Sequence, residues 1–222
     1  MSLEECDSKW EPVRLMMEHA KPVSLGSLHT YQMRHTPRRV LYTMSYYKFA
    51  CKLIGRDKSV LDVGCGEGLG TWMLAKECGG SHGIDFDEDL IATARGNWDG
   101  PNIAFGCDDF LDFSSGSFDG VVNFDVIEHI EGCHAGRFFR GMADCLGPYG
   151  IGVVGTPNLT AAKYASEVTN AGHINLYDAE RLRSEMLEVF TQVLLFGAND
   201  EVVHTGFLPM CQYLIAVGIR KK

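Results

Sequence analysis

The stretch from Val60 to Gly68, VLDVGCGEG, decides the fold of this chain. A short apolar run ends in three glycines at positions 64, 66 and 68, and residues 69–78 continue as a helix. A strand, a glycine turn and a helix in this order indicate the start of a βαβ unit. Because glycine has no Cβ, the backbone of such a turn can approach a ligand closely. We therefore expect a large ligand to lie against this turn.

Outward from the turn, strand and helix patterns alternate along the chain. Strands are predicted over 59–64, 81–86, 102–107, 118–124 and 150–155, and helices over 69–78, 89–97, 133–145 and 178–188. Two later apolar runs, 192–196 and 212–219, have the length and composition of strands that pair antiparallel at one edge. This alternation predicts an α/β fold with a doubly wound sheet of seven strands.

The chain is predicted to fold as one domain over 1–222. Residues 1–54 should form a helical N-terminal cap and 55–222 a ligand-binding core, with a loop insertion near 158–175 that covers the site. We find no internal repeat, low-complexity linker or charge run that would indicate a second domain. No feature marks an oligomer interface.

Composition excludes several classes of function. The net charge of −9 provides no basic surface for nucleic acid, and no apolar run approaches the roughly 20 residues that cross a bilayer. The opening MSLEECDSKW has no apolar signal core, so we expect a cytoplasmic location without membrane attachment. The eight cysteines form no CxxC pair, which favours reduced thiols over a zinc site.

The glycine spacing argues against a dinucleotide. The pattern GxGxxG fails in both registers, because Gly64 and Gly66 lead to Leu69, and Gly66 and Gly68 lead to Thr71. Asp62, two residues before the first glycine, is better suited to a cationic amino-acid group than to a pyrophosphate. We therefore expect a ligand with positive charge near the turn.

Acids after the next two strands suit an adenosine. Asp85 follows the glycine turn by roughly 20 residues, as a carboxylate that accepts both ribose hydroxyls does, with Asp87 as the neighbouring alternative. After the third strand, Asp108 or Asp109 offers a carboxylate for an exocyclic amine, and Phe110 an apolar face for a flat ring. Each acid alone is more often a loop carboxylate or a helix cap. Their order along successive strands favours an adenosine with a non-phosphate tail.

Residues 40–195 resemble the class I S-adenosylmethionine-dependent methyltransferases. VLDVGCGEG is similar to the first motif of the family, GIDFD to its ribose motif, SFDGVVNFDVIEHI to its fourth-strand motif and LGPYGIGVVGTPN to its fifth-strand region. The resemblance is strongest to a small-molecule branch that includes ubiquinone-biosynthesis O-methyltransferases. It implies a Rossmann-like sheet and S-adenosylmethionine as the cofactor. The implied cofactor-binding residues are Asp62, Gly64, Cys65, Gly66, Gly68, Asp85, Phe86, Asp108, Asp109 and Phe124.

The resemblance also implies attack of a substrate atom on the sulfonium methyl, with alignment as the main task of the protein. His129 is the expected base, and Glu128 and His173 are expected to assist it. A structural role for each is the alternative. We assign no metal ligand, although Asp125, Glu128, His129 and His173 together have the chemistry to hold Mg²⁺, Mn²⁺ or Zn²⁺.

The expected acceptor is a small molecule methylated on oxygen. A methyltransferase acting on protein and a non-catalytic binder of S-adenosylmethionine that regulates another process are the two alternatives. A macromolecular substrate would favour a basic surface or an extra domain, and the acidic balance with a short cap and one loop insertion provides neither.

Overall fold

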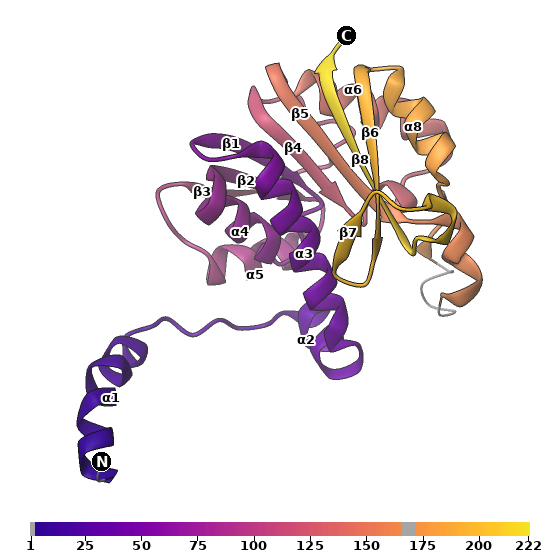
Figure 1. Cartoon of the computed structure of the whole chain (residues 1–222). Helices are drawn as coiled ribbons and strands as arrows, with labels where there is room; N and C mark the ends of the chain where they lie inside the picture. Colours follow the sequence, from indigo (N-terminus) through magenta and orange to yellow (C-terminus); the bar gives the residue numbers. More distant parts are fainter. Residues whose placement is uncertain (1–2, 166–171) are drawn as a thin grey trace.

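A twisted sheet with helices on both faces forms the centre of the molecule in the computed structural model, which describes residues 3–165 and 172–222 (Figure 1). The strands are β1 (Lys58–Val63), β2 (Gly79–Asp85), β3 (Ile103–Cys107), β4 (Phe118–Phe124), β5 (Leu146–Pro157), β6 (Phe190–Asn199), β7 (Val202–His204) and β8 (Tyr213–Lys221). The helices are α1 (Leu3–Glu18), α2 (Ser27–His35), α3 (Pro37–Ile54), α4 (Leu69–Cys78), α5 (Glu88–Asn97), α6 (Ala135–Asp144) and α8 (Ala179–Leu187). Short 3₁₀ turns are η1 (Ile127–His129), η2 (Gly132–His134), η3 (Leu159–Tyr164) and η4 (Leu208–Met210).

The sheet has the order β3-β2-β1-β4-β5-β8-β6-β7, and its first five strands are parallel. β8 pairs antiparallel with both β5 and β6, so the predicted antiparallel pairing of the last two long strands is confirmed. The described sheet has eight strands, and the predicted number of seven is wrong by one. The additional strand, β7, is three residues long and pairs only with the end of β6, and so short a segment carries no alternation pattern.

The strands are buried on both faces because alternate side chains point to opposite sides. Val60 and Val122 belong to one hydrophobic cluster, which packs under α3 and α4. Their neighbours Leu61 and Val121 belong to the other cluster, which packs under α6 and α8. This two-sided burial explains the nearly continuous apolar runs of the parallel strands.

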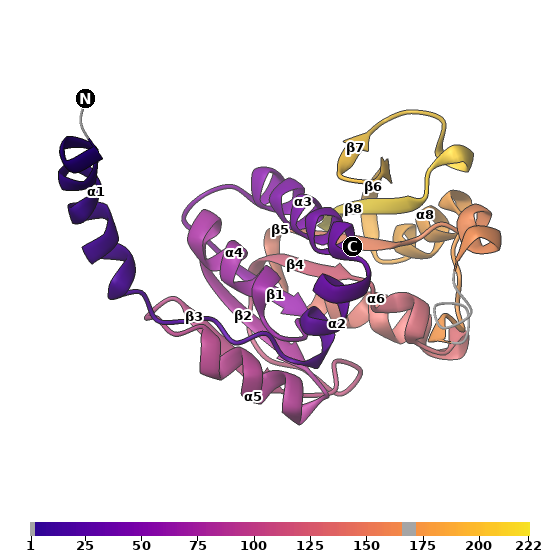
Figure 2. The ribbon, with the colours of Figure 1, turned by 90° about the horizontal axis from the view of Figure 1, so that it is seen from below.

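The N-terminal helices divide into two parts. α2 and α3 pack against each other, and α3 also crosses the sheet. α1 lies apart from the rest of the molecule in both views, at the end of an extended segment over 21–26 (Figure 2). Of the residues 1–54 expected to form a helical cap, α2 and α3 pack against each other and α3 against the sheet, whereas α1 exposes apolar side chains such as Trp10 and Met16.

Two further features adjust the predicted boundaries. The helix expected over 133–145 begins later, since residues 132–134 form the turn η2. The loop insertion expected over 158–175 contains η3, and its residues 166–171 lie outside the described structure. Among the described helices, none combines the length and the hydropathy of a transmembrane span.

Candidate active site

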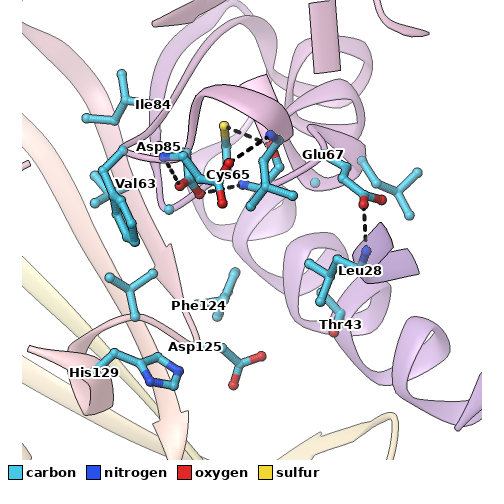
Figure 3. A pocket seen from close by; sticks show the side chains of 18 of the residues that line it. Leu28, Thr43, Val63, Cys65, Glu67, Ile84, Asp85, Phe124, Asp125 and His129 are labelled. Atoms are coloured by element: carbon cyan, nitrogen blue, oxygen red, sulfur yellow. Dashed lines mark hydrogen bonds between the residues drawn. The ribbon is translucent and has the colours of Figure 1, made fainter. Parts of the chain in front are cut away.

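A cavity of about 560 Å³ opens at the carboxyl ends of the parallel strands. It lies beside β1 and β4, where the strand order reverses, which is the usual ligand crevice of doubly wound sheets. Residues of α2 and α3 form the opposite wall, including Leu28 and Thr43 (Figure 3). The topology therefore brings the turns after β1, β2, β3 and β4 around one space.

The glycine turn after β1 lines this cavity with its first two glycines. Gly64 and Gly66 have φ values of +72° and +54°, a left-handed conformation that side chains rarely adopt. A Cβ at Gly64 would lie 2.1 Å from Val126 Cγ2. Cys65, between them, lines the cavity and is buried. Both glycines are favoured by the backbone conformation, and Gly64 is also required by the close approach of the chain after β4.

The third glycine has a different role from the one predicted. Gly68 does not line the cavity and precedes α4 with a φ of +79°. A Cβ there would lie 2.8 Å from the rings of Phe105 and Trp98. Gly68 therefore permits close packing at the start of the helix, and ligand contact is not its function in this structure.

Asp85 lies at the end of β2 and faces the glycine turn (Figure 3). Its carboxylate accepts hydrogen bonds from the Gly66 N–H at 2.9 Å and the Asp87 N–H at 3.1 Å. Phe86, beside it, also lines the cavity and is 80% exposed, so its ring is available to a ligand. Asp87, the alternative ribose acid, caps α5 by accepting from the Asp89 and Leu90 N–H groups. Asp85 and Asp87 both line the cavity.

Both candidate adenine acids line the cavity. Asp108 donates its backbone N–H to the Asp85 carbonyl at 3.0 Å, which joins the ends of β2 and β3. The Asp109 carboxylate accepts from the Leu111 N–H at 2.9 Å. Phe110 lines the same region and is 8% exposed. Phe124, at the end of β4, adds a second buried ring.

Asp62 does not reach the cavity, contrary to the expectation of a direct ligand contact. Its side chain is fully buried behind the glycine turn. It accepts hydrogen bonds from the Tyr47 hydroxyl at 2.9 Å and the Thr71 hydroxyl at 2.6 Å. Burial raises the pKa of Asp62 to about 7, against the effect of these two donors. Asp62 therefore ties α3 and α4 to β1 and supports the turn from behind.

The three residues expected to act in catalysis lie close together, but only His129 lines the cavity at the carboxyl ends of the strands. Candidate ligand atoms of Glu128, His129 and His173 lie within 4.8 Å of one another. His129 lines the cavity, and its Nδ1 lies 2.7 Å from the Gly172 carbonyl. A carbonyl only accepts, so Nδ1 carries the proton and Nε2 of the neutral ring has a free lone pair.

Glu128 is fully buried beneath His129 and lines no described cavity. Its Oε2 accepts from the Thr156 hydroxyl at 3.0 Å, and its backbone carbonyl accepts from the Ile174 and Asn175 N–H groups. Burial, together with the Asp125 charge, raises the pKa of Glu128 to about 8. Burial, together with His129, lowers the pKa of His173 below its ordinary value. At neutral pH the Glu128 carboxyl is thus mainly protonated and His173 mainly neutral.

One contact at the site was not predicted from the sequence. Glu67, within the glycine turn, accepts from the backbone N–H group of Leu28 at 2.8 Å (Figure 3). It also accepts from the His29 N–H at 3.2 Å and contacts the His29 ring. Its side chain thereby caps the start of α2. The only signal in the local sequence is an acid between two glycines of the turn, and this pattern does not indicate that the acid contacts α2.

An α/β fold that places a glycine turn and the acids after the next two strands around one cavity is typical of proteins that bind an adenosine-containing ligand. Residues 60–150 match the family described as "methyltransferase domain". Residues 60–150 therefore correspond to a methyltransferase domain, which agrees with the resemblance noted from the sequence motifs.

The sequence relatives agree with this class. A probable S-adenosylmethionine-dependent methyltransferase of Mycolicibacterium smegmatis is 34% identical over 144 residues, which are 64% of this chain and 54% of that protein. A ubiquinone biosynthesis O-methyltransferase of Azorhizobium caulinodans is 29% identical over 173 residues, 74% of this chain and 63% of that protein. The chain thus matches only part of the length of either relative.

Solved structures share the fold. A TehB-like methyltransferase from Corynebacterium glutamicum superposes with a TM-score of 0.64 at 18% identity and covers 88% of this chain and 100% of that one. The N-methyltransferase NodS from Bradyrhizobium japonicum, in complex with S-adenosyl-L-homocysteine, gives a TM-score of 0.56 at 23% identity, covering 85% and 86%.

Proposed function

We propose that this chain binds S-adenosylmethionine in the cavity at the carboxyl ends of β1 to β4 and transfers its methyl group to an oxygen of a small-molecule acceptor. The supporting observation is that the Gly64–Gly66 turn, Asp85 and the Asp108–Asp109 pair line one cavity in the order of the strands. The similarity to ubiquinone biosynthesis O-methyltransferases supports a small hydroxylated acceptor. The two helices α2 and α3 act as the cap of this site.

In this proposal the residues of the chain mainly align the reactants. Asp85 holds the ribose hydroxyls, Asp108 or Asp109 accepts from the adenine amine, and Phe86 and Phe110 contact the ring. Such alignment supplies several kcal/mol of the barrier by removing rotational and translational freedom beforehand. Asp62 acts as a positioning residue through the glycine turn.

The methyl transfer itself needs one proton acceptor. The acceptor oxygen forms a bond to the methyl carbon while the carbon–sulfur bond breaks, and sulfur keeps that electron pair to give S-adenosylhomocysteine. The hydroxyl proton passes to His129 Nε2, whose lone pair is free because Nδ1 donates to Gly172. Glu128 holds the backbone of the segment that carries His173, so it positions the site and does not serve as the base.

A divalent ion is a lesser alternative at this site. The carboxylate and imidazole donors of Glu128, His129 and His173 are chemically suitable, and Glu128 Oε1 is buried without a protein partner. An ion bound by these residues would act as a Lewis acid toward the acceptor oxygen. We expect transfer to proceed without it, so a strong chelator should leave the rate unchanged. Loss of activity that Mg²⁺ or Mn²⁺ restores would contradict this expectation.

Isothermal titration with S-adenosylmethionine and S-adenosylhomocysteine tests the proposal. Both should bind in the micromolar range, NAD should not compete, and Asp85→Ala should weaken binding by at least about tenfold through loss of charge-assisted hydrogen bonds. Asp89→Ala is the matched control, because Asp89 is exposed and does not line the cavity. Absence of binding to the wild-type protein would remove the methyltransferase proposal.

Acceptor assays separate the alternatives. Transfer of labelled methyl to hydroxylated small molecules supports the proposal, and transfer to proteins alone supports a protein methyltransferase. Tight cofactor binding without transfer to either class favours a non-catalytic regulator.

A further inference from the structure

A second cavity of about 580 Å³ adjoins the first. α3 forms one side of it, and the turn η3, the end of β5 and the start of β8 form the others. Arg39, Thr43 and Asp125 line both cavities, so the two spaces meet at these residues. His129 lies on the cofactor side and His173 on the second side of this junction.

Asp125 has a strained position at the junction. It follows β4 with a φ of +57°, a conformation that costs free energy in a residue with a side chain. Its Oδ2 lies 3.6 Å from the Arg39 guanidinium, while its Oδ1 is buried without a hydrogen-bond partner among the described residues. Strain of this kind is typical of residues held in place for a ligand.

Tyr213 provides the complementary group. It is 6% exposed, lines the second cavity and stacks on Tyr46 with ring centroids 4.4 Å apart. Its hydroxyl is also buried without a partner. Buried polar atoms are almost always hydrogen-bonded, so an unpaired carboxylate oxygen and an unpaired hydroxyl on two residues that line one cavity point to a bound polar group. A hydroxyl satisfies both, since it donates to Asp125 and accepts from Tyr213.

The outer part of the second cavity is positively charged. Arg38 and Arg39 line it with positive charges, beside the ring of His35 and the mainly neutral ring of His173, whereas Asp125 is the one acid among its described lining residues. Arg38 is exposed and forms no ion pair with any described residue. A hydrogen bond with Asp200, together with the charges of Asp200 and Glu201, raises the pKa of the Tyr42 hydroxyl, but neither acid lines the cavity. A basic pocket on a chain with a net charge of −9 attracts anions selectively.

Building on the function proposed above, we propose that the second cavity binds the methyl acceptor, and that this acceptor is a hydroxylated small molecule with a carboxylate or phosphate group. Its anionic group lies toward Arg38 at the solvent side. A second hydroxyl, distinct from the one that loses its proton to His129, lies between Asp125 and Tyr213 at the junction. Tyrosine rings from α3, η3 and β8 provide flat apolar walls for its carbon skeleton.

Matched acceptors test the charge requirement. The panel consists of hydroxylated benzoates, their neutral methyl esters and hydroxyphenyl phosphates, each titrated into protein loaded with S-adenosylhomocysteine. At least one anionic compound should bind about tenfold more tightly than its neutral ester. The carboxylate and phosphate arms identify which anion is preferred. If no anionic compound binds more tightly than its ester, the proposal is overturned.

Variants locate the anion. Arg38→Gln should weaken binding of the preferred anionic compound about tenfold, Arg38→Lys should largely restore it, and neither should change binding of the ester. Arg56→Gln is the matched control, because Arg56 is an exposed arginine that precedes β1, outside both cavities. An equal effect of Arg38→Gln on the anion and its ester would contradict a charge contact.

Tyr213→Phe separates recognition from folding. Removing a buried hydroxyl without a partner should leave the melting temperature unchanged or raise it, because the hydroxyl contributes no protein hydrogen bond. Acceptor binding should nevertheless weaken several-fold. Unchanged acceptor binding would refute the placement of the second hydroxyl. Binding of S-adenosylhomocysteine, measured first, distinguishes a failure of this inference from a failure of the proposed function.

Discussion

His129 combines a tautomer fixed by the backbone with a place on the wall of the cofactor cavity. Since general bases contribute roughly 10²- to 10⁴-fold to a rate, His129→Gln should lower kcat by a factor in this range and leave cofactor affinity nearly unchanged. Steady-state kinetics and titration of S-adenosylhomocysteine measure the two effects. His134→Gln, at an exposed histidine outside the cavity, is the control. An unaltered kcat would show that His129 only shapes the pocket.

Asp62 should make the protein less stable as the pH rises. Its pKa is about 7 in the folded chain and 3.8 in its unperturbed state, so between these values the folded protein binds more protons than the unfolded one. The free energy of unfolding therefore decreases from about pH 4 to pH 7 and levels off above, by roughly 4 kcal/mol at most.

Chemical denaturation of the wild type and of Asp62→Asn at several pH values measures this effect. The amide does not ionise, so the decrease should be smaller in the variant, and the difference between the two curves isolates Asp62 from Glu128 and other groups. Parallel curves would show that Asp62 does not titrate in this range.

At the scale of elements, the side chain of Glu67 attaches α2 to the glycine turn after β1. Glu67 caps the first turn of the helix through Leu28 and His29, which otherwise present unpaired N–H groups. Glu67→Ala should increase amide exchange over 27–35 and weaken S-adenosylmethionine binding a few-fold, because α2 forms part of the cavity wall. Glu77→Ala, at an exposed acid of α4, is the control. Unchanged exchange over α2 would contradict the capping role.

The strands illustrate why local patterns were informative for most elements. Neighbouring buried residues of a strand belong to different hydrophobic clusters, as in the pairs Val60–Leu61 and Val121–Val122. This alternation follows from backbone geometry, because successive side chains point to opposite faces of the sheet. The short strand β7 has no such pattern, because its position depends on pairing with the end of β6. A strand could therefore be predicted where buried side chains recur along the sequence. A strand such as β7, which depends on a single pairing with another strand, could not be predicted.

At the scale of the molecule, α1 is separate from the sheet. Lys21 pairs with Asp99 at 3.0 Å, and the Ser24 backbone exchanges hydrogen bonds with Asn97, so the segment after α1 is attached to the end of α5 and to the loop two residues beyond it. Deletion of 1–19 should consequently leave the melting temperature and cofactor affinity unchanged within error. Calorimetry and titration of the shortened chain test this, and a large loss of stability would show that α1 packs on the domain in solution.

The sequence by itself determined the parallel half of the sheet, the glycine turn and the position of Asp85. These depend on periodic burial and on backbone conformations that only glycine adopts readily, and both are local properties. The location of the acids after β2 and β3 at one edge of the sheet also follows from the sequence, since successive parallel strands end at the same edge.

The tertiary structure alone decided which of these residues face a ligand. Asp62 and Gly68 belong to the same motif as Gly64, yet packing against Tyr47 and Phe105 takes them away from the cavity. The second cavity and the Arg39–Asp125 pair join segments far apart in the chain. Such contacts depend on how whole layers pack, because side chains distant in sequence meet only after the sheet and its helices have assembled.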